Sequence, residues 1–322
     1  MRGAARIDLA KHPDALATCM LLATVAIWGS IAQVTDVAAG HAQPLMLTAL
    51  RAAPTPLVLL LAAPFLRFRL PRGASAWAFT AIGGLLMVGV FLSGFTEAVT
   101  RAGPGNAIVV ASTSPFWVAI FSRLVYGERI RPRTAIGLLA GFAGVILIFS
   151  SQLGSQAGAG RTAVGLLFAL AAALGWAAGV LIVKEQLTRQ PDTDLLGVVA
   201  GQYLIGGAVL LAVAFATEGS GGASWSSGDL WLAVAYISIV GSAIATVLYF
   251  GALRLTSPTR ATAWSFLSPV VAILISIGLG EAPKAAVFAG MAITIVGVCV
   301  VNLPQRGQRV PDAVGEPSVV AP

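Results

Sequence analysis

Residues 100–145 read TRAGPGNAIVVASTSPFWVAIFSRLVYGERIRPRTAIGLLAGFAGV. The second half of the chain repeats the landmarks of this stretch in the same order: Pro104, Asn106, Ala107, Ser114-Pro115, Gly127-Glu128, Gly137 and Gly144 correspond to Pro258, Arg260, Ala261, Ser268-Pro269, Gly280-Glu281, Gly290 and Gly297. The offset is constant from Trp77/Trp231 to Pro115/Pro269, and it slips by one residue just before the Gly-Glu pairs. Chance agreement between two Ala- and Gly-rich segments does not explain this order, so the sequence predicts an internal duplication.

The composition is that of a membrane protein. Hydrophobic residues make up 57% of the chain and charged residues 10%, whereas soluble domains carry roughly 25% charged residues. Apolar runs of about 20 residues, the length needed to cross a bilayer, follow one another along the chain. We predict an all-α integral membrane fold with ten transmembrane helices near 15–34, 44–64, 74–96, 104–124, 134–150, 162–183, 195–216, 229–250, 257–279 and 285–303. The length of the first run favours a span over a cleaved signal peptide.

The spans divide into two halves of five. We expect a first repeat over residues 1–150, a second repeat over 162–303 and a disordered cytoplasmic tail over 304–322. With the N-terminus in the cytoplasm, the inside segments hold sixteen Lys and Arg residues and the outside connections three. This asymmetry predicts that both termini face the cytoplasm and that the lipid bilayer is the inner membrane of the cell. Because each half has an odd number of spans, the second repeat is expected to insert upside down relative to the first.

Several classes of function lack their signatures in the sequence. The net charge of +7 is explained by the topology, and no basic run alternates with aromatic residues, so we predict no nucleic-acid partner. The sequence has no Gly-x-x-x-x-Gly-Lys-[Ser/Thr] pattern, so it shows no P-loop with which to bind ATP and drive transport. His12 and His41 lie outside the predicted spans, and Cys19 and Cys299 lie inside them as small apolar residues. We therefore expect no metal site, no cofactor and no catalytic residues.

With these landmarks in hand, the chain resembles the EamA-type transporters of the drug/metabolite transporter superfamily over nearly its whole length. The resemblance is carried by the order of short motifs: Trp28-Gly29, Arg51, the proline-led start of span 4, Ser114-Pro115, Gly127-Glu128-Arg129, Ser268-Pro269 and Gly280-Glu281. It implies two inverted five-helix repeats around a central cavity, and carriage of small metabolites, often the export of amino acids or related compounds. Two positions depart from the expected pattern: Trp176 is followed by Ala177 instead of glycine, and Glu97 stands where an apolar or small residue is expected.

Two charged residues lie within or at the end of predicted spans. Arg51 is seven residues after Pro44, so a rise of 1.5 Å per residue places it roughly 10 Å from the outer face. Glu97 closes span 3 at the same face. We hypothesise that the two form an ion pair or line an outer vestibule; alternatively Arg51 holds a substrate carboxylate, or either side chain extends to the interface. A desolvated Glu97 would be a proton-carrier candidate, and the proton is the coupling ion we consider.

The remaining candidate site residues are prolines, hydroxyls, aromatic rings and amides. Pro115 and Pro269 fall half-way along spans 4 and 9, where each removes a helical hydrogen bond and predicts a hinge. Ser114 and Ser268 are candidates to bond the freed carbonyls or the substrate. The aromatic and amide residues at membrane depth are candidate substrate contacts, with helix packing as the alternative for each: Trp28, Trp176, Tyr249, Trp264, Asn106 and Gln202.

Small residues four positions apart in spans 5 and 6 indicate close helix packing. In span 5, Gly137/Gly141 and Ala140/Gly144 fit a scaffold contact or a homodimer contact. Glu128 and Glu281 each follow a glycine before a helix start, and we predict that they stabilise the helix N-termini.

The sequence as a whole predicts a secondary transporter that exports a small metabolite, such as an amino acid or a related compound, by alternating access. The alternatives left open are a phosphorylated-sugar or nucleotide-sugar exchanger, which would need several cations, and a membrane partner protein without transport. An integral-membrane enzyme would need paired catalytic groups in the membrane, and none is visible.

Overall fold

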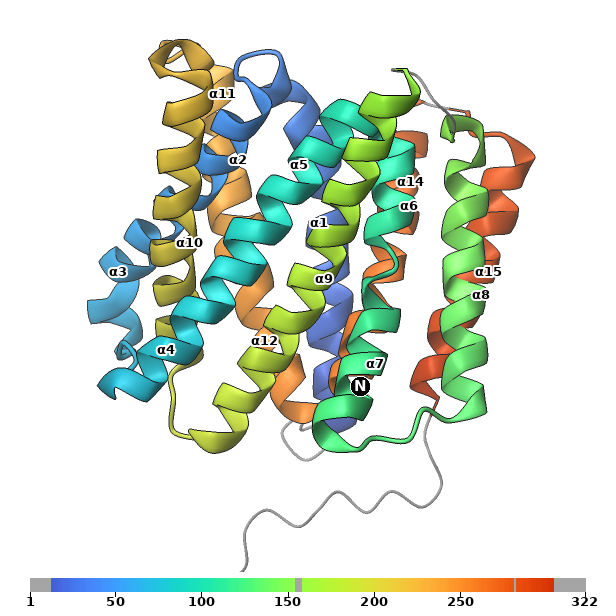
Figure 1. The fold of residues 1–322 in the computed structure, drawn as a ribbon, viewed down its shortest axis with the longest axis horizontal. Coiled ribbons are helices and arrows are strands. Elements are labelled where there is room, and N and C mark those ends of the chain that lie inside the picture. The colour runs from blue at the N-terminus through green and yellow to red at the C-terminus, as the bar shows by residue number, and fades with distance from the viewer. Residues whose placement is uncertain (1–12, 154–157, 281, 304–322) are drawn as a thin grey trace, which may run out of the picture.

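The computed structural model describes residues 13–153, 158–280 and 282–303. Ten of its helices are long and apolar enough to cross a membrane, which confirms the predicted span count (Figure 1). The spans, numbered 1 to 10 in chain order, are Pro13–Ala39, Pro44–Phe65, Gly73–Ala102, Pro104–Tyr126, Pro132–Gln152, Ala159–Arg189, Leu195–Glu218, Gly228–Leu255, Pro258–Gly278 and Ala285–Asn302. Spans 3 and 6 extend about one to two turns beyond the predicted ends, so Glu97 lies within span 3 instead of closing it.

Five of the ten spans are interrupted within their length. The unbroken ones are α1 (Pro13–Ala39), α9 (Ala159–Arg189), α10 (Leu195–Glu218) and α15 (Ala285–Asn302), and span 5 is α8 (Pro132–Phe149) with one 3-10 turn. Span 2 is α2 (Pro44–Ala52) and α3 (Pro54–Leu66), span 4 is α6 (Pro104–Ala111) and α7 (Ser114–Tyr126), and span 9 is α13 (Pro258–Ala263), η6 (Trp264–Phe266) and α14 (Leu267–Gly278). Each of these three breaks lies next to a proline, which cannot donate a helical hydrogen bond.

Spans 3 and 8 share a π-helical segment at matching positions. Span 3 is α4 (Gly73–Gly84), η2 (Leu85–Val90) and α5 (Phe91–Ala102), and span 8 is α11 (Gly228–Tyr236), η5 (Ile237–Ile244) and α12 (Ala245–Leu255). The offset that aligns Trp77 with Trp231 also aligns η2 with the greater part of η5. Since π-helical segments are rare and frequent at functional sites, their recurrence supports the duplication and draws attention to these two spans.

The glycines of spans 5 and 10 show how the two repeats are related. A Cβ on Gly144 would lie 2.6 Å from the Gly290 carbonyl, and a Cβ on Gly137 would lie 2.8 Å from the Gly297 carbonyl. In the sequence alignment, however, Gly137 corresponds to Gly290 and Gly144 to Gly297. Swapping the two halves therefore turns the Gly144–Gly290 contact into the Gly297–Gly137 contact. A two-fold axis between antiparallel helices requires this relation. The predicted inverted repeat accounts for this pairing. The glycines of span 5 pack against span 10 of the same chain.

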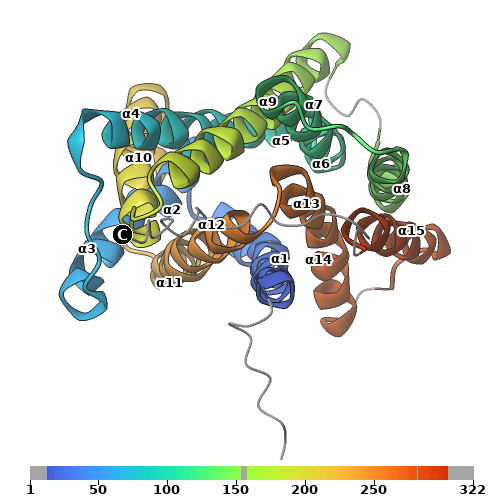
Figure 2. The ribbon, with the colours of Figure 1, turned by 90° about the horizontal axis from the view of Figure 1, so that it is seen from below.

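Seen along the membrane normal, six spans form two facing rows (Figure 2). In the first row, span 1 packs between spans 8 and 9; in the second row, span 6 packs between spans 3 and 4. Each row thus mixes the two repeats, and the swap of repeats exchanges the rows. The pair of spans 2 and 7 joins the rows at one end, and the pair of spans 5 and 10 stands at the other.

Helix α1 begins and α15 ends at the same face, here called the N-terminal face (Figure 1). Because the spans alternate in direction, the connections 67–72, 127–131, 190–194 and 256–257 lie at this face, and most described arginines and lysines lie in or beside them. The opposite face has Arg101, Arg161 and Lys284. The predicted charge asymmetry is therefore present between the faces. The predictions made for residues 1–12, Glu281 and the tail 304–322 lie outside the described residues.

Candidate functional site

Three predicted aromatic residues meet between the two rows, half-way along the spans. The rings of Trp28 and Trp176, one from the central span of each row, have centroids 5.4 Å apart in an edge-to-face arrangement. Tyr249 of α12 lies 5.5 Å from Trp28 and 5.4 Å from Trp176. Phe91 of α5 completes the group at 4.9 Å from Trp176. These four residues, called the central aromatic cluster, bring the rows together.

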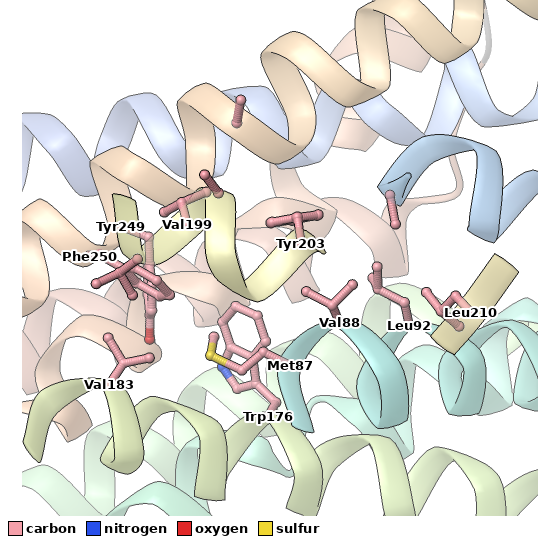
Figure 3. Close-up of a cluster of buried hydrophobic side chains, with 14 of the residues drawn as sticks. Met87, Val88, Leu92, Trp176, Val183, Val199, Tyr203, Leu210, Tyr249 and Phe250 are labelled. Carbon is pink, nitrogen blue, oxygen red and sulfur yellow. The ribbon is translucent and has the colours of Figure 1, made fainter. Parts of the chain in front are cut away.

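Hydrogen bonds orient the rings of this region. The Tyr249 hydroxyl bonds to the Thr262 hydroxyl of α13 at 2.8 Å, and the Tyr203 hydroxyl of α10 pairs with Thr246 of α12 at 3.3 Å. Figure 3 shows Tyr203 and Tyr249 on one side of the buried core and Trp176 with Met87 on the other. The indole N–H of Trp176 lies near the Tyr249 hydroxyl without reaching hydrogen-bond geometry, so it has no partner within the described part of the chain. Since a buried indole N–H normally finds an acceptor, the Tyr249 hydroxyl is the group beside it that can accept.

Arg51 lies on α2, towards the opposite face from the N-terminus. Its backbone carbonyl accepts hydrogen bonds from Thr55 at 3.2 Å and from Ser238 of η5 at 3.0 Å, so its position is fixed against a π-helical segment. Its guanidinium makes no hydrogen bond and no ion pair with any described residue, and its buried Nε is unpartnered. Protein surrounds the side chain, and part of it nevertheless stays accessible.

The predicted pairing of Arg51 with Glu97 is wrong. Glu97 forms an ion pair with Arg101 of the next turn, at 2.6 Å, and the Arg101 guanidinium also lies over the Phe168 ring. Residues four apart on a helix face each other and pair readily. Glu97 thus sits in a local ion pair near the end of span 3.

The counterpart residues Asn106 and Arg260 both bond to the ends of helices. The Asn106 amide donates to the Ala102 carbonyl at 2.7 Å, and Arg260 Nη2 donates to the Asn302 carbonyl at 3.0 Å. Both carbonyls belong to the last turn of a helix, where no intrahelical donor is left. These two residues therefore close helix ends at opposite faces of the protein.

The remaining predicted amide and ring, Gln202 and Trp264, lie in other helix contacts. Gln202 Nε2 is buried and unpartnered, and it lies against Gly83 of α4, 2.5 Å from where a Cβ would stand. Its place is therefore the contact of span 7 with span 3. Trp264 lies in η6 and packs against two buried hydrophobic groups, one that includes the cluster and one around spans 5 and 10.

Helix breaks lie at both predicted proline positions, but hydroxyls other than the expected ones bond the carbonyls there. Thr113 donates to the Val110 carbonyl at 2.7 Å, and Ser265 donates to the Thr262 carbonyl at 2.7 Å. The Ser268 hydroxyl is buried without a partner, so its predicted role of bonding a freed carbonyl is wrong. Ser114 begins α7 and is buried, immediately before Pro115.

At the N-terminal face, one lysine links the two rows. Lys184, near the end of α9, donates to the Leu253 carbonyl at 2.8 Å and to the Thr256 carbonyl at 3.1 Å. Both acceptors lie at the C-terminal end of α12, where the helix dipole also favours a cation. Beside it, the Arg254 side chain bonds to the Thr193 carbonyl of the next connection. We call Lys184 with its two acceptor carbonyls the lysine latch.

Glu128 lies next to this latch. It was predicted to stabilise the start of α8, but that helix begins after Arg131 and has no side-chain cap, so the prediction is wrong. The carboxylate instead interacts electrostatically with Lys184. Burial raises the pKa of Glu128 above its ordinary value, and the attraction of Lys184 opposes this shift.

The latch has no equivalent at the opposite face. The swap of repeats exchanges spans 6 and 8 with spans 1 and 3, yet no hydrogen bond or ion pair joins spans 1 and 3 among the side chains that the structure describes. The counterpart of Lys184 in span 1 is Asp36. The contact of spans 2 and 7, in contrast, is bonded at both faces, by Glu218 to the Met46 N–H at 2.6 Å and by Asp194 to the Arg69 N–H at 2.9 Å. Among the described side chains, which do not include that of Asp36, a hydrogen bond joins spans 6 and 8 at the N-terminal face and none joins their counterparts, spans 1 and 3, at the opposite face.

Comparison of the chain with known proteins shows which family it belongs to. The EamA-like transporter family matches residues 15–150 and again 163–303, the two five-span halves. The chain belongs to the EamA-like transporter family. Its relatives in this family include "Uncharacterized transporter YvbV" of Bacillus subtilis (strain 168), 26% identical over 91% of this chain and 93% of that protein. "Uncharacterized inner membrane transporter YedA" of Escherichia coli (strain K12) is 30% identical over 88% and 89%. A solved crystal structure aligns with a TM-score of 0.75 at 26% identity, covering 88% of this chain and 95% of the other.

Sequence reasoning missed three contributors to the site of this EamA-like transporter. Phe91 has the spacing of any apolar helix residue, and Thr262 was one hydroxyl among many. Lys184 was read only as a topology charge, because its acceptors are backbone carbonyls that no side-chain pattern reveals. A signal was available for Lys184: it lies eight residues after Trp176 on one helix, so the two share a face.

Proposed function

We propose that this EamA-like transporter is a secondary carrier of the inner membrane that exports a small metabolite of the amino-acid type or a related compound. The two rows would rock about the central aromatic cluster, so that the substrate site opens alternately to the two faces. The observation that supports this proposal is an asymmetry between equivalent helix pairs: the lysine latch joins spans 6 and 8 at one face, whereas no described side chain joins spans 1 and 3 at the other. A carrier needs rows that can be released one face at a time.

The charge asymmetry supports the orientation of this carrier. The face with most arginines and lysines is proposed to be cytoplasmic, which places both termini in the cytoplasm. The lysine latch then closes the cytoplasmic side. The proton is the proposed coupling ion, because the chain carries no nucleotide-binding pattern and a secondary carrier draws on a gradient.

Reconstitution tests this function. The purified protein is placed in liposomes, and the efflux of radiolabelled amino acids and related metabolites is followed with and without an imposed pH gradient. A metabolite-toxicity screen in overproducing cells selects the panel. Saturable flux of a panel member supports the carrier, and its acceleration by the pH gradient supports proton coupling. Absence of flux for every solute selected by the screen would favour a partner protein without transport.

A further inference from the structure

Two buried donors, one on α2 and one on span 8, have no partner among the described residues. Arg51 has a buried Nε without a partner and a guanidinium that no described carboxylate neutralises. Ser242 of η5 has a buried hydroxyl that is likewise unpartnered. Burying a charge or a hydroxyl without a partner is costly, and inside a membrane such groups usually face a substrate path.

These two donors belong to one row of polar groups. Ser238 bonds to the backbone of Arg51, and Ser242 and Thr246 follow at intervals of four residues along span 8. Thr246 pairs with the Tyr203 hydroxyl of α10 at 3.3 Å. One turn further, Tyr249 belongs to the central aromatic cluster. The row therefore leads from an unpaired cation to a set of aromatic rings.

We propose that Arg51 and Ser242 bind the carboxylate of the transported substrate, and that the central aromatic cluster receives an apolar or aromatic remainder of the same molecule. This inference rests on the carrier function proposed above and names its substrate class. A guanidinium presents parallel N–H donors that match the two oxygens of a carboxylate. The carboxylate end points towards the face opposite the N-terminus.

One cation favours a carboxylate over a phosphate ester. A phosphate carries close to two negative charges and would call for several cations. The other described arginines and lysines near the rows are already bonded to backbone carbonyls or to a carboxylate: Arg101, Lys184, Arg254 and Arg260. The substrate that fits is an organic acid or amino acid with a bulky apolar group.

Binding to the purified protein in detergent tests this inference without relying on flux. The probes are 3-phenylpropanoate and its uncharged isostere 3-phenylpropanamide, and the readout is the ligand-dependent rise in melting temperature. The wild type should be stabilised at lower concentrations of the acid than of the amide. Arg51→Gln should weaken the acid at least tenfold and leave the amide unchanged, and Ser242→Ala should weaken the acid less. Arg101→Gln, which removes the same charge elsewhere in the same half of the protein, is the matched control and should bind like the wild type.

Three results would overturn the proposal. They are that the wild type binds the acid and the amide equally, that it binds neither, or that Arg51→Gln binds the acid as tightly as the wild type does. If Arg51→Gln does not fold, Arg51→Lys and Ser242→Ala replace it. For these variants the same comparison is made, between the concentrations of acid and of amide that stabilise the protein. The two proposals fail separately. Flux of neutral solutes alone, with no acid preference, removes the carboxylate site and leaves the carrier. Acid binding through Arg51 without any flux removes the carrier and leaves the site.

Discussion

Replacing Lys184 by methionine should release the rows at the N-terminal face. The change keeps the length and apolar stem of the side chain and removes the two hydrogen bonds to the Leu253 and Thr256 carbonyls. Among the described side chains, no equivalent bond between spans 1 and 3 offsets this loss at the opposite face. The variant should therefore shift the population towards a state open at the N-terminal face.

The size of the shift follows from the two bonds. Hydrogen bonds from a charged donor contribute about 1.5–3 kcal/mol each. Water can take over the exposed side of these helix-end carbonyls, so we expect a net loss of about 2–3 kcal/mol for the pair. At about 1.4 kcal/mol per factor of ten, the open population should rise about 30- to 150-fold.

Thiol accessibility measures this population. Val180 lies between Lys184 and Trp176 at helical spacing and is fully buried, so Val180→Cys reports opening of the path from the latch to the cluster. The native Cys19 and Cys299 are exposed and are first replaced by alanine. The rate of labelling by a membrane-impermeant maleimide, applied from the N-terminal face, should rise by the same 30- to 150-fold while the open state stays minor.

Arg189→Met is the matched control for this prediction. Arg189 lies five residues further along the same helix and pairs with Glu185 of that helix, so its loss breaks no bond between the rows. Its labelling rate should equal that of the parent. The reasoning is refuted if Lys184→Met labels no faster than the parent, or if Arg189→Met accelerates labelling equally.

Three further predictions concern pH, the cluster and the scaffold. Because the pKa of Glu128 is raised, its contribution to stability is present at acid pH and is lost as the pH rises through that pKa. Glu128→Gln should therefore raise the melting temperature at pH 8 and reduce the dependence of the melting temperature on pH. The control Glu185→Gln should leave that dependence unchanged. Trp176→Ala removes three ring contacts and should lower the unfolding free energy by about 3–5 kcal/mol, measured by denaturant titration in micelles; a loss under 1 kcal/mol would contradict the cluster. Gly144→Ala places a Cβ against Thr294 and 2.6 Å from a backbone carbonyl, which should cost about 1–3 kcal/mol, while Gly160→Ala, with open space around it, should cost nothing.

Much of the fold was accessible to sequence reasoning because lipid imposes simple rules. Span length, the alternation of charged connections and the repeated Ser-Pro pairs predicted ten helices in two inverted halves, with breaks beside Pro115 and Pro269. Trp28 and Trp176 were matched through the repeat, and the structure brings them into contact. These features depend on the identity and order of residues along the chain.

The pairing of polar groups was not accessible in the same way. Arg51 and Glu97 were expected to meet because both lie towards one face, but depth alone does not fix the side of a helix, and Arg101 was available one turn away from Glu97. The i, i+4 spacing of Glu97 and Arg101 was a readable signal. The partners of Lys184 and Ser238 are backbone carbonyls, which every residue offers, so only the structure could identify them.

Opposite movements of the two faces are the most direct test of the central claim. Spin labels at the exposed positions Thr188 and Leu255 report the distance between spans 6 and 8 at the N-terminal face, and labels at Val37 and Thr100 report spans 1 and 3 at the opposite face. Pulsed electron spin resonance in liposomes, with and without the flux-competent substrate, gives both distance distributions. The account predicts two populations in which one distance lengthens as the other shortens. Distances that lengthen together, or that stay fixed under conditions of measured flux, would contradict it.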